Sequence, residues 1–270
     1  MPKIRPLTPT IGAEVSGLDL DRGYAEVDDA VIAELTAAFH RHKVLFFRGQ
    51  EIDPARQRDF AARFGPLQRF PMGEPAAPGL DEVMVLATGG TAPAHHKADR
   101  WHSDATFLPC PPMGSMLRAI ELPPVGGDTL WADMEAAYAA LSPRFQALLE
   151  GLTAVHDHRR NPIHRATLDP DKHRPVEHPV VRTHPVTGRR GLFVNSTFTD
   201  RINGVGDREG AALLAFLLQH VERPEFQCRF RWAPGDIAMW DNRCTQHNAV
   251  FDYHEPRLMH RIVFEGDAPR

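Results

Sequence analysis

Three side chains with metal-binding atoms stand out in this 270-residue chain, and two of them are neighbours. His102 and Asp104 are separated by one residue in the stretch Trp101-His102-Ser103-Asp104. If this stretch is a β-strand, both side chains project from the same face, because successive side chains alternate between faces. An imidazole nitrogen and a carboxylate oxygen would then converge on one cation. The spacing therefore predicts two adjacent ligands of a metal site.

The third candidate ligand, His247, lies far along the chain. It follows an apolar run, residues 236–240, that is typical of a buried strand. Two histidines and a carboxylate on one face of an octahedron leave three positions open, as in non-haem Fe(II) oxygenases. A His-x-Asp triplet is a weak signal by itself in a chain with 15 histidines. The hypothesis therefore depends on the residues that accompany it.

Supporting residues occur in segment 257–264, where apolar residues alternate with polar ones. Arg257 and Arg261 would lie on the same face of a strand there. A guanidinium buried without a partner is very unfavourable, so an arginine in a strand-rich core usually meets an anion. Arg257 is therefore a candidate for binding the distal carboxylate of a dicarboxylic co-substrate.

Four motifs together resemble the taurine/2-oxoglutarate dioxygenase (TauD/TfdA) family. They are the Trp-His-x-Asp stretch, the turn Gly126-Gly127-Asp128-Thr129, the Trp-Asp-Asn segment before His247, and the strand that begins at Arg257. They occur in the family's order, and the likeness covers almost the whole chain. The resemblance implies a mainly β fold with flanking helices, built on a double-stranded β-helix (jelly-roll, cupin-like) core.

The resemblance also implies the cofactors and the reaction. Fe(II) would be held by His102, Asp104 and His247, and 2-oxoglutarate would chelate the iron while Arg257 and Thr129 contact its far carboxylate. O2 would occupy the remaining position, and a substrate C–H would be hydroxylated with succinate and CO2 as co-products. Iron halogenases of this general fold have a small residue at the position of Asp104, so the carboxylate favours hydroxylation.

The substrate contacts of the taurine enzymes are mostly changed. By position in the family pattern, a sulfonate-binding histidine falls at Phe70, a tyrosine at Gly73, an asparagine at Ala98 and a Ser-Phe pair at Asn161-Pro162, whereas Arg261 is retained and Phe198 matches a cavity-lining aromatic. The pocket thus keeps an anion clamp but gains apolar lining. We expect an anion larger or more apolar than taurine, such as an alkyl sulfate, an alkyl sulfonate or an aryloxyalkanoate.

Length and composition predict one domain over residues 1–270, soluble and cytoplasmic. The net charge of −4 provides no basic field, so nucleic acid is not an expected partner and a small substrate fits better. No signal peptide and no run of about 18 apolar residues is present, so no membrane association is expected. Three scattered cysteines indicate neither a disulfide framework nor a thiolate metal site. Relatives often pair, which allows a homo-oligomer, either a dimer or a tetramer.

Periodicity and capping residues predict the elements around these motifs. Asp28 or Asp29, Asp53 and Asp207 are the expected helix caps, the apolar run 44–47 predicts a strand buried on both faces, and Thr187-Gly188 predicts a hairpin turn. Helices are expected at 28–43, 53–65, 134–141, 142–151 and 207–221, and strands at 44–47, 83–86, 102–104, 115–120, 129–131, 179–183, 191–194, 227–232, 236–240 and 257–264. Segment 68–100 is rich in Pro and Gly and predicts a lid or pocket loop, in which His95 and His96 are read as solvated. Segment 156–178 carries many His and Arg; an exposed, mobile loop is favoured over an anion-attracting lid.

Two other functions use the same residues. A metallohydrolase would hold Zn²⁺ at the His/Asp/His site and activate water, but it leaves Arg257 and Thr129 without a role. A non-catalytic jelly-roll binding protein would keep a vestigial pocket. In such a protein we would expect at least one of the three metal-ligand residues to be replaced, whereas all three are present. A purely structural reading would require each of these polar residues to be satisfied independently in the core.

Overall fold

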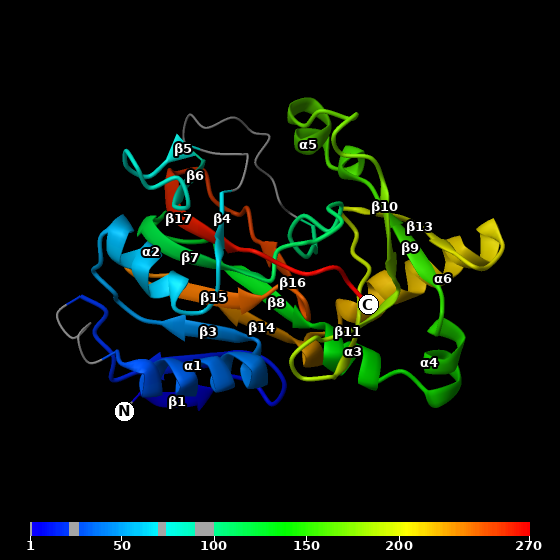
Figure 1. The fold of residues 1–270 in the computed structure, drawn as a ribbon, viewed down its shortest axis with the longest axis horizontal. Coiled ribbons are helices and arrows are strands. Elements are labelled where there is room, and N and C mark those ends of the chain that lie inside the picture. Colours follow the sequence, from blue (N-terminus) through cyan, green and yellow to red (C-terminus); the bar gives the residue numbers. More distant parts are fainter. Residues whose placement is uncertain (1, 22–26, 70–73, 90–99) are drawn as a thin grey trace.

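The computed structural model describes residues 2–21, 27–69, 74–89 and 100–270, and its core is a pair of facing sheets (Figure 1). The larger sheet has the order β1-β2-β3-β15-β7-β17-β6-β5, with β4 paired to β17. Its strands are β1 (Lys3–Pro6), β2 (Ala13–Ser16), β3 (Val44–Phe47), β4 (Leu67–Gln68), β5 (Glu74–Pro75), β6 (Met84–Thr88), β7 (Gly114–Glu121), β15 (Ile237–Asp241) and β17 (Arg257–Phe264). Apart from the parallel β2–β3 pair, neighbouring strands in it are antiparallel.

The smaller sheet is antiparallel and has the order β14-β8-β16. It consists of β14 (Gln227–Phe230), β8 (Thr129–Asp133) and β16 (Thr245–Ala249). Aromatic residues of both sheets fill the space between them: Phe46 stacks on Phe230 with ring centroids 4.1 Å apart, and Trp131 lies 5.7 Å from Trp240. Two antiparallel sheets around one apolar interior form the architecture expected for a jelly roll.

Two helices cover the outer face of the larger sheet. They are α1 (Asp29–His42) and α2 (Pro54–Ala62), and both begin at predicted caps, where the Asp28 and Asp53 carboxylates accept backbone N–H bonds. Because these helices pack on one face and the smaller sheet on the other, all four residues of β3 are buried. The continuous apolar run at 44–47 therefore predicted a strand buried on both faces correctly.

A second group of elements lies beside the two sheets, on the right in Figure 1. It contains α3 (Met134–Ala139), α4 (Pro143–Leu149), α6 (Asp207–Val221), β9 (Thr153–His156), β10 (Val176–Pro179), β11 (Val181–Thr183), β12 (Arg190–Leu192) and β13 (Thr199–Asn203). These elements share their own apolar cluster, and β11 and β12 form the predicted hairpin. The expected cap of α6 was wrong by one residue: Gly206 is the cap, and the Glu209 carboxylate accepts its N–H. Within the described residues, no helix is both long and apolar enough to cross a membrane.

Segment 156–178 is largely exposed between residues 159 and 177, as predicted, but it is not irregular and both of its ends are buried. It contains the 3-10 helix His158–Arg160, helix α5 (Pro162–Thr167) and the start of β10. His156, His158 and His178 are all buried. His178 is held by the carbonyls of Thr106 and Leu108, which explains why local sequence could not reveal its burial. In segment 68–100, the candidate contacts Phe70 and Ala98 lie outside the described residues, as do Gly73, His95 and His96.

Candidate metal centre

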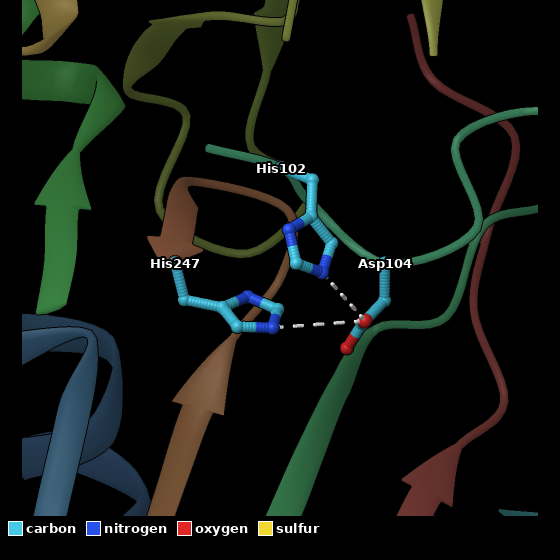
Figure 2. Close-up of side chains that lie close together, drawn as sticks. All are labelled: His102, Asp104 and His247. Atoms are coloured by element: carbon cyan, nitrogen blue, oxygen red, sulfur yellow. Dashed lines mark ion pairs between the residues drawn. The ribbon is translucent and has the colours of Figure 1, made fainter. Parts of the chain in front are cut away.

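His102, Asp104 and His247 converge, as their residue types predicted (Figure 2). The Nε2 atoms of both histidines lie 3.8 Å from the same oxygen of Asp104, Oδ1. The two imidazole rings are 4.2 Å apart between centroids. Two nitrogens and one carboxylate oxygen that face a common point form a donor set suited to a divalent transition metal.

The backbone at this site differs from the predicted strand. His102 forms a single antiparallel bridge with His247, in which each residue donates its N–H to the other's carbonyl, at 3.1 and 2.8 Å. The chain then turns at Asp104, and Ala105 adopts a positive φ of 48°. The two ligands therefore do not share a strand face; the bridge aligns the histidines and the turn brings the carboxylate to them.

Asn242 explains the turn, and sequence reasoning missed it. Its side-chain oxygen accepts the N–H of Asp104 at 2.6 Å, and its amide donates to the carbonyls of Asp104 and Pro112, each at 3.0 Å. These bonds take the partners that a neighbouring strand would supply, so the ligand backbone is fixed by a side chain. The Trp-Asp-Asn motif contained this residue, but nothing in its spacing indicated that it would bind residue 104.

The two oxygens of Asp104 have different surroundings. Oδ1 faces the imidazoles, whereas Oδ2 lies 2.5 Å from Arg261 Nη2 and accepts a 3.0 Å hydrogen bond from Ser115 Oγ. Burial opposes ionisation of Asp104, but the guanidinium of Arg261, the two histidines and the Ser115 hydrogen bond together outweigh it and hold the carboxyl pKa well below its ordinary value. The site therefore contains a carboxylate anion at neutral pH.

Both histidines are neutral at this pH. Burial lowers the pKa of His102 and lowers that of His247 to about 3, although the Asp104 carboxylate opposes both shifts. The Nδ1 of His102 lies 2.8 Å from the carbonyl of Arg100, which can only accept, so Nδ1 carries the proton. The lone pair of a neutral His102 then lies on Nε2, the atom that faces Asp104, as a metal ligand requires.

Arg257 is a buried cation with incomplete hydrogen bonding. It is 7% exposed, and its Nε and Nη2 atoms have no hydrogen-bond partner among the described residues. Burial lowers its guanidinium pKa, with the Tyr253 hydroxyl opposing that shift. A Cβ on Gly127 would lie 3.4 Å from Arg257 Cδ, so the glycine turn packs closely on this side chain. A buried guanidinium with two donors that no described residue satisfies is suited to binding an anion.

Thr129 and Arg257 both lie next to the indole ring of Trp232. The Thr129 hydroxyl accepts a 3.0 Å bond from Trp232 Nε1, and the guanidinium carbon of Arg257 lies 6.0 Å from the Trp232 ring centre. Acting as an acceptor leaves the hydroxyl proton of Thr129 available for another acceptor. The two residues that the family resemblance connected therefore both lie next to Trp232.

The remaining predicted contacts have distinct surroundings. Phe198 is buried and its ring lies 6.3 Å from that of His102, within an apolar cluster that includes Phe107. Asn161 uses its side-chain oxygen to cap α5, a structural task that sequence did not indicate. His164 of α5, which was not predicted, stacks on Phe198 at 5.4 Å.

Fold and donor set together define a class. Facing antiparallel sheets with two histidines, one carboxylate and a nearby buried arginine are the features of a jelly-roll, non-haem metal-dependent oxygenase. The chain belongs to the TauD/TfdA family: the family model "Taurine catabolism dioxygenase TauD, TfdA family" matches residues 3–263.

Individual relatives agree with this membership. The chain is 38% identical to an alpha-ketoglutarate-dependent sulfate ester dioxygenase of Pseudomonas putida, over 98% of this chain and 90% of the relative. It is 36% identical to an alkylsulfatase of Acinetobacter baylyi, over 98% and 85%. A solved taurine dioxygenase from Burkholderia xenovorans superimposes with a TM-score of 0.85 at 36% identity, covering 99% of this chain and 92% of that one. The chain is therefore a 2-oxoglutarate-dependent dioxygenase with a jelly-roll core, and it uses Fe(II), 2-oxoglutarate and O2.

Proposed function

We propose that His102, Asp104 and His247 bind the iron, and that this enzyme hydroxylates an organic anion of the alkyl sulfate type. The observation that carries the metal assignment is the approach of both Nε2 atoms to one oxygen of Asp104. Two neutral imidazoles and one ionised carboxylate occupy three positions of an octahedral ion. Three positions then remain for 2-oxoglutarate and O2.

Arg257 and Thr129 bind the far carboxylate of 2-oxoglutarate in this proposal. The support is the unsatisfied guanidinium, since the buried Nε and Nη2 donors of Arg257 would gain an anionic partner. The Thr129 hydroxyl, fixed through Trp232, would donate a second bond. A zinc hydrolase mechanism at the same metal site gives this buried cation no role, which is why we prefer the dioxygenase.

The substrate class follows from residues next to the proposed metal ligands. Arg261 supplies positive charge within 2.5 Å of a metal ligand, and the Phe198 and Phe107 rings supply apolar surface. Two of the relatives are named for sulfate esters or alkyl sulfates, and the taurine-binding positions are changed in this sequence. We therefore infer an alkyl sulfate, with alkyl sulfonates and aryloxyalkanoates as the next candidates.

The bound iron supplies the oxidising chemistry: one O2 and one 2-oxoglutarate become succinate and CO2 while one oxygen atom is inserted into a substrate C–H bond. This chain's side chains orient the reactants and exclude water. If the hydroxylated carbon bears a sulfate ester, the product is a hemiacetal-like ester that collapses to an aldehyde and sulfate. Residues 1–270 act as one catalytic domain in this proposal.

The test has two stages. Anaerobic addition of Fe(II) and then 2-oxoglutarate should produce the weak visible charge-transfer band of the chelate, and Asp104→Asn should abolish it. Alkyl sulfates of increasing chain length, alkyl sulfonates, aryloxyacetates and taurine are then compared for succinate release, and released sulfate is measured for the esters. Absence of the band in the wild-type protein would refute the metal assignment. Taurine turnover comparable with that of the best alkyl sulfate would refute the substrate class.

A further inference from the structure

Ser115 is a buried serine of β7 that contacts the proposed iron ligand. We propose that Ser115 is a positioning residue: together with Arg261 it holds the second oxygen of Asp104, so that the carboxylate binds iron through Oδ1 alone. The inference rests on the proposed function, because it concerns the geometry of that metal site. Neither the sequence motifs nor the family resemblance assigns a role to this serine.

The contacts form a closed arrangement around one oxygen. Ser115 Oγ donates to Asp104 Oδ2 at 3.0 Å and accepts from Arg261 Nη2 at 3.1 Å, while the same Nη2 lies 2.5 Å from Oδ2. Ser115 has no exposed surface, so water does not compete for its hydroxyl. A hydroxyl that donates to the carboxylate and accepts from the guanidinium orients both groups at once.

The two oxygens of Asp104 therefore have different partners. Oδ2 is occupied by Ser115 and Arg261, whereas Oδ1 faces the two imidazole nitrogens at 3.8 Å and accepts no hydrogen bond from a described residue. Binding through both oxygens would require the carboxylate to rotate and break the contacts at Oδ2. One-oxygen binding leaves the positions that 2-oxoglutarate and O2 need. Ser115 therefore protects open coordination positions by holding an oxygen away from the metal.

The backbone beneath Ser115 is well suited to this role. β7 lies between β15 and β17 in the larger sheet, and Ser115 pairs with Trp240 on one side and Val263 on the other. Arg261 is two residues from Val263 on the adjacent strand, so the serine and the arginine are diagonal neighbours. A hydroxyl on a central, doubly paired strand is placed more rigidly than one on a loop.

Ser115→Ala tests the proposal, with Co(II) as the metal probe because it reports coordination through its visible spectrum. Removing a group that orients a metal ligand typically weakens metal binding about 10- to 100-fold. We expect the Co(II) dissociation constant of S115A to rise about 10-fold and its visible spectrum to change, with the melting temperature of the metal-free protein nearly unchanged. The dissociation constant for 2-oxoglutarate on the Co(II) protein should rise as well, because a second carboxylate oxygen would compete for its position.

Ser103→Ala is the matched control. Ser103 is also a buried serine and lies between the two ligands in sequence, but its hydroxyl donates to the backbone carbonyl of Thr245 and not to Asp104. The Co(II) affinity and spectrum of S103A should stay close to those of the wild-type protein. An equal loss in both variants would overturn the proposal, since the effect would then follow from losing any buried hydroxyl near the site. Co(II) affinity and spectrum unchanged in S115A would also overturn it.

A second pair of variants covers the case in which S115A does not fold. Ser115→Thr and Ser115→Val differ by a hydroxyl in place of a methyl, so they carry nearly the same added volume. We expect the Thr variant to bind Co(II) more tightly than the Val variant by about 10-fold, and equal affinities would overturn the inference. Failure of the wild-type protein to bind Co(II), Fe(II) or 2-oxoglutarate would instead refute the proposed function, and the role of Ser115 with it.

Discussion

Two buried clusters in this protein have nearly the same composition and different properties. The metal-centre cluster contains His102, Asp104 and His247, and the second cluster contains His184, Asp241 and Cys244. In each, an aspartate is buried beside an arginine. Burial opposes ionisation, but the arginine and the neighbouring histidines together outweigh it, so the carboxyl pKa lies below its ordinary value. Residue types alone would make both clusters candidates for a metal.

Hydrogen bonding separates the two clusters. Asp241 accepts three hydrogen bonds from Arg243 and one from His184 Nε2, at 2.6 to 3.0 Å. The other nitrogen of His184 accepts the backbone N–H groups of Val186 and Thr187. In the metal-centre cluster the nearest approach of each Nε2 to the carboxylate is 3.8 Å, too long for a hydrogen bond.

The difference shows how to distinguish a ligand set from a structural network. Donor atoms that already bind protein groups must lose those bonds before they can bind a metal, and burial makes that loss expensive. The Asp241 cluster is therefore a structural hydrogen-bond network, whereas the donor atoms of the metal-centre cluster converge without hydrogen bonds between them. The same substitution made in both clusters should consequently affect different quantities.

Asp104→Asn should have the largest effect of all. It removes the only anionic ligand while keeping the side-chain volume. Losing a ligand should exceed the loss from an orienting group, so we expect Co(II) affinity to fall by more than about 100-fold and succinate production to disappear. Isothermal titration with Co(II) and a succinate assay provide the measurements. An active D104N enzyme with wild-type metal affinity would show that the cluster of His102, Asp104 and His247 is not the metal-ligand set.

Asp241→Asn should instead reduce stability. The amide cannot balance the charge of buried Arg243, and its NH2 group would face donors on Arg243 and His184. Breaking a buried ion pair by removing one partner typically costs about 3–5 kcal/mol, and we expect the free energy of unfolding in urea to fall by about 3 kcal/mol. The folded fraction should keep its Co(II) affinity. A variant with normal stability and impaired metal binding would show that the second cluster acts on the metal centre directly.

The sequence predicted the ligands and missed the residues that hold them. His102, Asp104, His247 and Arg257 have side chains whose chemistry is unusual inside a core, so their types and order were informative. Ser115 and Asn242 are ordinary residues of strands and turns, and their roles arise only from contacts with residue 104, which is distant from Asn242 in sequence. Functional positioning by such residues is a property of the folded structure.

Prediction of the elements succeeded where local patterns are sufficient. The alternating segment 257–264 is a strand with the predicted bounds, and α1 begins at its predicted aspartate cap. The predicted strand at 102–104 was wrong, because Asn242 replaces the strand partners of Asp104. The buried ends of segment 156–178 were missed for the same kind of reason, since His156 and His178 both contact Thr106, which lies far from them in sequence.

Arg257→Met extends the comparison to a third site. Arg257 is a buried cation that, unlike Arg243, lacks a carboxylate partner within the described residues, and the substitution removes it. Methionine fills a similar space and leaves no unsatisfied donor, whereas two donors of Arg257 are buried without a partner in the part of the chain that the structure describes. We expect 2-oxoglutarate affinity to fall at least about 10-fold while the metal-free protein becomes more stable by about 1 kcal/mol. Titration of the Co(II) protein and urea unfolding measure the two effects. Unchanged 2-oxoglutarate affinity would show that the unpaired donors serve another anion.

His156 tests whether an unpartnered nitrogen is enough to mark a ligand. His156 is buried, and its Nε2 has no hydrogen-bond partner among the described residues, whereas its Nδ1 contacts Thr106. Burial lowers its pKa from 6.5 to about 3, with His178 adding to the shift. Because the unfolded chain binds a proton that the folded protein excludes, stability should fall as pH decreases below 6.5 towards about 3.

His156→Asn should therefore flatten that dependence without affecting the metal. One excluded proton contributes a slope of about 1.4 kcal/mol per pH unit, and asparagine can keep the contact with Thr106 without titrating. Urea unfolding of the metal-free protein at several pH values should show that the free energy of unfolding depends less steeply on pH in H156N, by the equivalent of about one proton. The Co(II) affinity of H156N at neutral pH should equal that of the wild-type protein. An unchanged slope would mean that the imidazole is accessible to protons in the folded state. Lost Co(II) affinity would mean that the His156 imidazole contributes to metal binding.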